Sequence, residues 1–144
     1  MPNICLTFGT SAAPDKVMEM LNTIEGLSKW WTILTSGSTE EGGIIEFRFP
    51  DTGPDMKVIE SAPDRVEWEC TAGPDEWIGT RIHFDVSQKD GQTHLMFKHE
   101  GWAEEVPFFY HCSTKWAVFM VSLRNHLETG KGQSFTDYIR IDLN

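Results

Sequence analysis

PFFYHCSTKWAVFMVSLRNHLET, the stretch from Pro107 to Thr129, predicts one long helix near the end of the chain. Its apolar residues recur at intervals of three and four, which places them on one helical face; they are Phe108, Phe109, Cys112, Trp116, Phe119, Met120, Leu123 and Leu127. Pro107 suits the first helical turn, where its missing N–H has no partner to lose, and Gly130 can adopt the left-handed conformation that ends a helix. Such a helix would be about 34 Å long. It could cross a whole sheet, and its broad apolar face must be covered.

The chain before this helix shows mainly the two-residue alternation of β-strands. Apolar and polar residues alternate in residues 4–9, 45–49, 65–70, 81–86 and 94–97. Turn signals such as Asp90-Gly91 separate these segments. Two short helices are expected after the first strand, one opened by Pro14 and a second that ends near Trp31. We therefore predict an α+β fold in which a curved antiparallel sheet of about six or seven strands grips the long C-terminal helix.

The length of 144 residues suits one domain, which we place at residues 1–132. Residues 133–144 are expected to be an ordered C-terminal extension. Apolar and charged residues alternate in residues 139–143, which predicts a strand with one apolar side that joins a sheet edge or reaches a second subunit. Val118 and Val121 lie away from the main apolar face of the long helix. They are a candidate contact surface for a homodimer.

Composition excludes several classes of protein. With 22 acidic and 12 basic residues the net charge is −10, which disfavours binding to nucleic acid phosphates. No run of eighteen apolar residues exists, so we expect no membrane span. The three cysteines lack a CxxC pattern, and neither a cluster of metal ligands nor a phosphate-binding loop is found, so we predict no disulfide framework, metal or cofactor. Without a signal-peptide pattern, a cytoplasmic location is expected.

The aromatic content is higher than an ordinary aliphatic core requires. Six tryptophans and nine phenylalanines supply large, rigid surfaces that can either fill a core or line a cavity. We predict a closed, largely apolar cavity between the concave sheet face and the long helix. The candidate lining residues are Trp30, Trp31, Phe47, Trp68, Trp77, Phe84, Phe97, Phe109, Trp116 and Met120. The alternative is that these side chains only fill the core.

Three polar residues are candidates for chemistry. Strand alternation places His99 on the apolar side beside Phe97, where an imidazole could orient a ligand or transfer a proton. The alternative is a buried histidine with all its hydrogen bonds satisfied. Glu60 would join it if its weak strand keeps register, but a slip of one residue would turn Glu60 to the surface. Tyr110 is the third candidate for proton transfer.

Three stretches resemble a known family. The first is similar to the opening of the START-like (SRPBCC) superfamily, which has the birch-pollen-allergen helix-grip fold; its residues are Ala12, Pro14, Asp15, Val17, Leu21, Gly26, Leu27, Lys29, Trp30 and Trp31. Residues 90–102 resemble the last hairpin, and residues 122–132 resemble the helix end, of one branch: the bacterial homologues of the activator of the heat-shock chaperone ATPase. The chain departs from this branch at Met18, where tryptophan is frequent.

The resemblance implies a fold more strongly than a function, because members share a scaffold while differing in ligand and activity. The first hypothesis is a module that binds a small hydrophobic or aromatic molecule. The second is an enzyme resembling the polyketide cyclases and dehydratases of the superfamily, with His99 and either Glu60 or Tyr110 in proton transfer. The third, a chaperone-associated interaction protein, is implied by the resemblance alone. Non-covalent binding is the function we favour, and enzymatic activity is the less favoured one.

Overall fold

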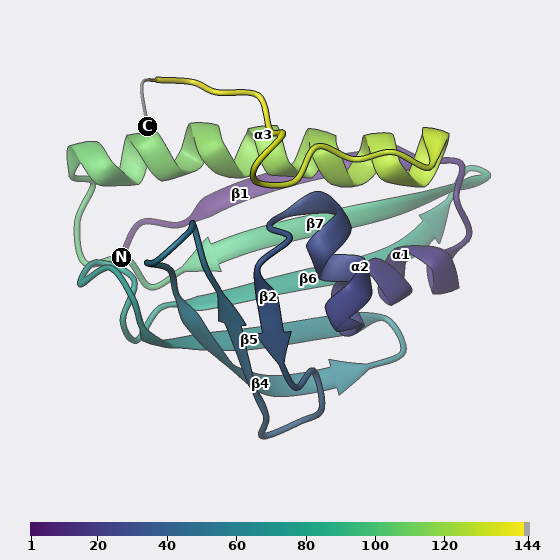
Figure 1. The fold of residues 1–144 in the computed structure, drawn as a ribbon. Coiled ribbons are helices and arrows are strands. Elements are labelled where there is room, and N and C mark those ends of the chain that lie inside the picture. The colour runs from purple at the N-terminus through teal and green to yellow at the C-terminus, as the bar shows by residue number, and fades with distance from the viewer. Residues whose placement is uncertain (143–144) are drawn as a thin grey trace.

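A seven-stranded antiparallel sheet is the framework of residues 1–142, the part of the chain that this computed structural model describes (Figure 1). Its strands are β1 (Ile4–Thr10), β2 (Thr35–Gly37), β3 (Ile44–Phe47), β4 (Asp55–Ala62), β5 (Arg65–Ala72), β6 (Arg81–Lys89) and β7 (Gln92–Glu100). The spatial order is β1-β7-β6-β5-β4-β3-β2, so the first strand pairs with the last while the others form a meander. The predicted α+β fold is confirmed.

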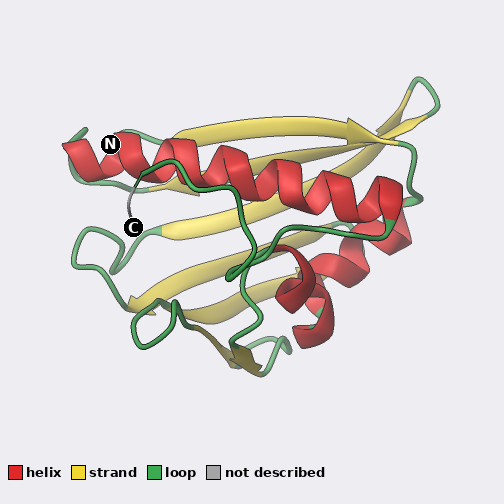
Figure 2. Cartoon of the chain, turned by 45° about the horizontal axis from the view of Figure 1, so that its top comes forward, coloured by secondary structure: helices red, strands yellow, loops and turns green. Residues whose placement is uncertain are grey.

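Three helices cover one face of this sheet: α1 (Pro14–Asn22), α2 (Ile24–Trp30) and α3 (Pro107–Thr129). Figure 2 shows α3 crossing the sheet, with α1 and α2 at one end of the same face. The bounds of α3 are those predicted, and Gly130 ends the helix at φ 82° with its N–H donating to the His126 carbonyl. At the junction of α1 and α2, a Cβ on Gly26 would lie only 2.4 Å from the Glu19 carbonyl oxygen, so this close packing requires glycine. None of the helices in residues 1–142 is long and apolar enough to cross a membrane.

The concave face of the sheet carries the core. The inward residues of β5, β6 and β7 are buried, as their alternation predicts; they are Val66, Trp68, Cys70, Ile82, Phe84, Val86, Leu95, Phe97 and His99. Antiparallel register places Phe84 opposite Phe97 and Trp68 opposite Ile82. Most outward residues of β5 and β6 are charged and form ion pairs, such as Arg65 with Asp85 at 2.6 Å.

The described part of the tail is held at its start and does not continue as a strand. The Phe135 N–H donates to the Trp31 carbonyl over 2.8 Å, and one isolated parallel bridge joins Phe135 to Thr32. The Tyr138 ring then stacks on Phe119 with 5.5 Å between centroids. The predicted strand is wrong for residues 139–142. The tail is held by Phe135 and Tyr138, which precede the alternating residues, and Ile139 is half exposed instead of packed on a sheet edge. Leu143 lies outside the described residues, and the division at residue 132 stays a prediction.

Candidate functional site

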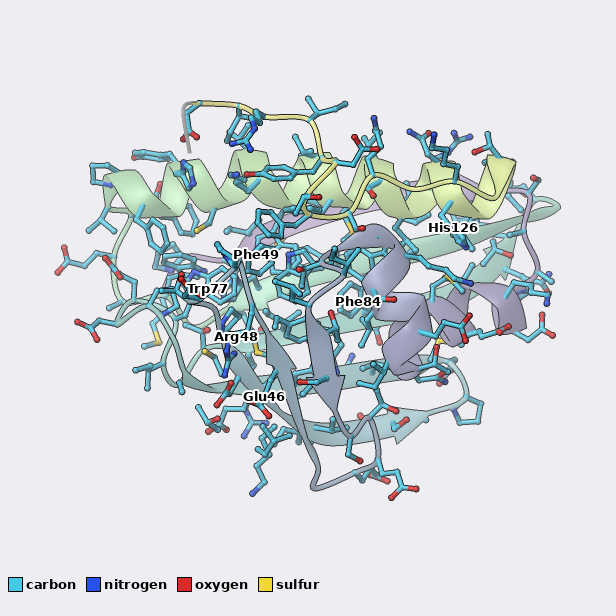
Figure 3. All side chains as sticks on the ribbon, in the orientation of Figure 1. Glu46, Arg48, Phe49, Trp77, Phe84 and His126 are labelled. Atoms are coloured by element: carbon cyan, nitrogen blue, oxygen red, sulfur yellow. The ribbon has the colours of Figure 1, made fainter. Side chains whose placement is uncertain are left out.

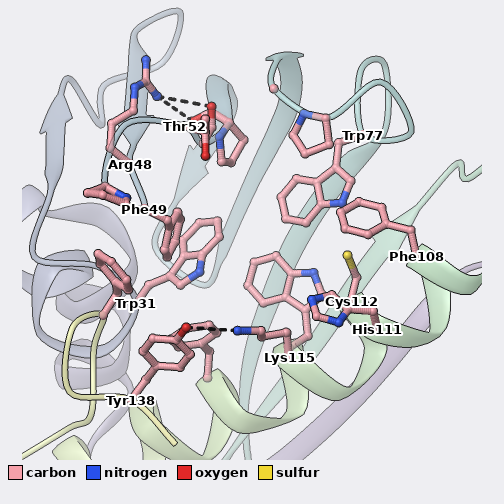
Figure 4. Close-up of a pocket in the computed structure, with 18 of the residues that line it drawn as sticks. Trp31, Arg48, Phe49, Thr52, Trp77, Phe108, His111, Cys112, Lys115 and Tyr138 are labelled. Carbon is pink, nitrogen blue, oxygen red and sulfur yellow. Dashed lines mark hydrogen bonds between the residues drawn. The ribbon is translucent and has the colours of Figure 1, made fainter. Parts of the chain in front are cut away.

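A pocket of about 1000 Å³ opens between α3, two loops and the tail (Figure 4). One wall comes from the loop between β3 and β4 and another from the loop between β5 and β6. The first half of α3 forms the floor, and the tail closes one side. Eight aromatic residues line it: Trp31, Phe49, Trp77, Phe108, Trp116, Phe119, Phe135 and Tyr138. The pocket is open to solvent on one side, which differs from the closed cavity that the sequence predicted.

Of the predicted lining residues, Trp31, Trp77 and Trp116 line this pocket, and their part in binding stays a prediction. The other predicted residues lie elsewhere; they are Trp30, Phe47, Trp68, Phe84, Phe97, His99, Phe109 and Met120. The physical reason is mutual packing: the Phe84 ring contacts those of Trp68 and Phe97 at 5.3 Å each, which leaves no open volume between them. For this group the alternative interpretation, a filled core, describes the geometry.

Five rings of the pocket were not predicted from the sequence; they are Phe49, Phe108, Phe119, Phe135 and Tyr138. Phe108 and Phe119 belong to the apolar stripe of α3, and Phe49 extends the alternation of its strand, so each carried a signal of burial but not of a cavity. Phe135 and Tyr138 lie in the tail and carried no such signal. These five rings reach the pocket only because segments distant in sequence come together.

His99 is buried and has both ring nitrogens in hydrogen bonds. The Trp116 indole N–H donates to Nδ1 over 3.1 Å, which requires Nδ1 to be unprotonated. Nε2 therefore carries the proton and donates it to the Thr80 hydroxyl oxygen at 2.8 Å, and that hydroxyl donates to the Trp77 carbonyl. Burial lowers the pKa of His99 to about 3. His99 is thus a neutral group that positions the Trp116 indole in the pocket wall.

Glu60 and Tyr110 do not meet His99. A β-bulge between Val58 and Glu60 shifts the register of β4, and Glu60 pairs with Arg65 at 3.1 Å on the outer face of the sheet. Tyr110 is 57% exposed on α3. The register slip considered from the sequence accounts for Glu60, and the three predicted catalytic residues form no common site.

Trp77 contributes the most unusual polar group of the pocket. Its side chain is buried, and its Nε1 makes no hydrogen bond of good geometry in the described part of the chain, where the weakly accepting Cys112 sulfur is its neighbour. Figure 4 shows the indole nitrogen turned toward Phe108 and Cys112. Burial raises the pKa of the Cys112 thiol to about 11, although the neighbouring Trp77 N–H acts in the opposite direction. A buried donor without an acceptor is energetically unfavourable, so an acceptor group in this part of the pocket would be stabilised.

Comparison with known proteins places the chain in a family. No protein-family model and no curated protein matches the sequence. Among solved structures, the Aha1 dimer from Colwellia psychrerythraea is 44% identical, covers 92% of this chain and 100% of its own, and has a TM-score of 0.84. The chain belongs to the Aha1-like branch of the START-like superfamily.

More distant structures share the fold of this Aha1-like chain. The protein SSP2350 from Staphylococcus saprophyticus has a TM-score of 0.75 at 14% identity, with 92% of this chain and 97% of its own covered. CalU16 from Micromonospora echinospora has a TM-score of 0.72 at 15% identity, with 85% of this chain and 72% of its own covered. At such identities the likeness concerns the fold alone.

The two basic residues Arg48 and Lys115 at the pocket of the Aha1-like chain differ in their partners. Arg48 is held by Asp55 at 2.8 Å and Glu46 at 3.1 Å, and Figure 3 shows Arg48 beside Glu46. Lys115 extends from α3 to the tail, where its Nζ donates to the Tyr138 hydroxyl over 3.3 Å. Within residues 1–142 no group of three or more histidine, cysteine, aspartate or glutamate side chains is arranged to hold a metal ion.

Proposed function

We propose that the pocket binds a small hydrophobic or aromatic molecule without covalent chemistry. The observation that carries this proposal is the aromatic lining: eight rings surround an open volume of about 1000 Å³, the upper end of the range for small-molecule sites. Flat rings bury a large area of a planar ligand while losing little side-chain entropy. Such a site suits a planar, apolar body.

The rings of the proposed site are held in place before a ligand arrives. Trp116 stacks on Trp77 with 5.8 Å between centroids, and it contacts Trp31 at 4.8 Å. The hydrogen bond from the Trp116 indole to His99 sets the orientation of this central ring. Preorganisation of this kind reduces the entropy cost of binding. The role of His99 in the proposal is therefore to position Trp116.

Blocking the pocket mouth should abolish binding. Thr52 is exposed in the loop that forms one wall, so Thr52→Trp would place an indole in the opening without disturbing the core. The probe is N-phenyl-1-naphthylamine, an uncharged aromatic molecule whose fluorescence rises in apolar sites. We expect its Kd to increase at least about tenfold, because its contact area with the walls would be lost.

Thr71→Trp is the matched control, because Thr71 is exposed on β5 and does not line the pocket. This variant should bind the probe as the unaltered protein does. The proposal fails if the unaltered protein does not bind the probe, or if Thr52→Trp and Thr71→Trp have the same affinity.

We also propose that the chain forms a homodimer. The support is the similarity to a structure that is itself a dimer, across nearly the whole chain. Val121 is 52% exposed on α3 and is a candidate contact.

Val121→Lys should therefore shift the mass measured by light scattering toward the monomer, since a charge buried at an apolar interface is strongly unfavourable. Ser87→Lys, at an exposed position on β6, is the control. A monomeric unaltered protein would contradict this proposal.

A further inference from the structure

Most charged residues that line the pocket are basic, whereas the net charge of the whole chain is negative. The sequence has 22 acidic and 12 basic residues. Three of those basic residues, Arg48, Lys115 and Arg140, line the pocket, whereas Asp51 is the one carboxylate among its lining residues. Arg48 is paired with carboxylates, whereas Lys115 and Arg140 form no ion pair within residues 1–142, so the side of the pocket formed by α3 and the tail is locally cationic. This local field would attract an anion that the rest of the surface repels.

Lys115 is a pocket cation that forms no ion pair within the described residues. Its side chain is half-buried, and its Nζ lies 4.4 Å from the centroid of the Tyr138 ring. The one hydrogen bond it makes, to the Tyr138 hydroxyl, is long at 3.3 Å and joins it to a neutral group. Within residues 1–142 no carboxylate forms an ion pair with Lys115. An ammonium has three N–H donors and is costly to bury unpaired, so an anionic partner would be strongly favoured here.

The other cations at the pocket are less suited to this role. Arg48 already binds two carboxylates, those of Glu46 and Asp55. The His111 Nδ1 lies 3.1 Å from a carboxylate oxygen of Asp142. Arg140 is exposed and lies 5.4 Å from the centroid of the same Tyr138 ring, where it can add to the field around Lys115 but is well solvated.

Lys115 also lies where an apolar body and an anionic head group can bind together. It precedes Trp116 in α3, and Figure 4 shows its ammonium joined to the Tyr138 hydroxyl beside the aromatic wall. A planar ligand stacked on the Trp116 side would bring a head group at its edge to the Lys115 ammonium. The pocket therefore offers aromatic walls and a half-buried cation without an ion pair in the same place.

We infer that the pocket selects amphipathic anions, molecules with a planar apolar body and a single anionic head group such as a carboxylate or sulfonate, and that Lys115 binds the head group. This inference rests on the proposed function of the pocket and adds the class of ligand.

A matched pair of probes tests the inference. N-phenyl-1-naphthylamine and 8-anilinonaphthalene-1-sulfonate share the same aromatic body, and only the second carries a negative charge. Both are titrated by fluorescence against the unaltered protein, Lys115→Met, Lys115→Arg and Lys57→Met. Lys57 is exposed on β4 and lies outside the pocket, so its variant changes the net charge equally and leaves the site intact.

The unaltered protein should bind the sulfonate at least about tenfold more tightly than the uncharged probe, since a charge-assisted contact in a partly dry site adds that much affinity. Lys115→Met should remove this preference, because it should weaken binding of the sulfonate far more than binding of the uncharged probe. Lys115→Arg should keep most of the preference, and Lys57→Met should keep all of it. Raising the salt concentration should reduce the preference of the unaltered protein.

The outcomes separate this inference from the proposed function. If both probes bind with equal affinity, or if Lys115→Met and Lys57→Met have the same effect on sulfonate binding, the selection of anions is wrong while the pocket remains a binding site. If neither probe binds, the proposed function itself is wrong. Loss of both probes in Lys115→Met would also contradict the inference, because it would show that the lysine supports the pocket rather than the head group.

Discussion

Phe84→Ala is expected to lower the free energy of unfolding by about 3–5 kcal/mol, the usual cost of removing a fully buried aromatic ring. Phe84 has no exposed surface, and its ring packs between those of Trp30, Trp68 and Phe97 at centroid distances of 5.3 to 6.1 Å. The surrounding rings are stiff, so they cannot collapse into the space left behind. Urea denaturation monitored by tryptophan fluorescence measures the change.

Phe108→Ala is the matched control for Phe84→Ala. Phe108 is half-buried at the edge of the pocket, so its loss should cost only about 1 kcal/mol in stability. It should nevertheless weaken binding of N-phenyl-1-naphthylamine, whereas folded Phe84→Ala should bind this probe normally. A small stability change in Phe84→Ala, together with lost binding, would instead place Phe84 in a cavity wall.

Acidification from pH 6.5 to 4.5 should destabilise the protein by about 2 kcal/mol through His99 alone. Burial lowers the pKa of His99 from 6.5 to about 3 in the folded protein. The unfolded chain therefore binds a proton in this range and the folded chain does not. The stabilisation is fully present above pH 6.5 and is lost as the pH falls toward 3. The measurement is a series of urea unfolding curves between pH 4.5 and 7.

His99→Leu should flatten this pH dependence, although the variant is less stable at pH 7 because the Trp116 N–H loses its acceptor. His126→Gln is the comparison. The pKa of His126 is also lowered, by partial burial and by Lys29, so this variant should remove a smaller part of the slope. The pKa values of carboxylates such as Glu67 and Glu128 are lowered in the folded protein from the ordinary value of 4.5, so these groups add to the loss of stability mainly at the acid end of this window. A slope unchanged in His99→Leu would contradict a neutral, buried imidazole.

The fold could be predicted because its signals are local. The helical period and the end residues of α3 identify it and its bounds, and the alternation of β5, β6 and β7 identifies which side chains face the core. Strands joined by short turns usually pair with each other, which restricts the order of strands in the sheet. The prediction that His99 lies on the inner face is also confirmed, because successive side chains of a strand alternate between the two faces of the sheet.

The candidate site could be predicted only in part. Trp31, Trp77 and Trp116 were recognised as possible wall residues, but Phe84 and Trp68 carry the same sequence signal and lie in the filled core. Periodicity predicts the face of a strand or helix on which a side chain lies. It does not predict whether that side chain packs against another residue or borders a cavity. The bulge in β4 that turns Glu60 to the outer surface has no local signature either.

The sequence by itself determined the helix-grip framework, the inward face of each central strand and the absence of long apolar spans, because these follow from patterns between near neighbours in the chain. Only the tertiary structure decided where open volume remains. The pocket lies where Trp31, the loop after β3, the loop after β5, α3 and the tail meet, and Lys115 meets Tyr138 across 23 positions of the sequence. Whether a buried ring borders a neighbour or a cavity depends on such distant contacts, because packing is a property of the segments that assemble around it.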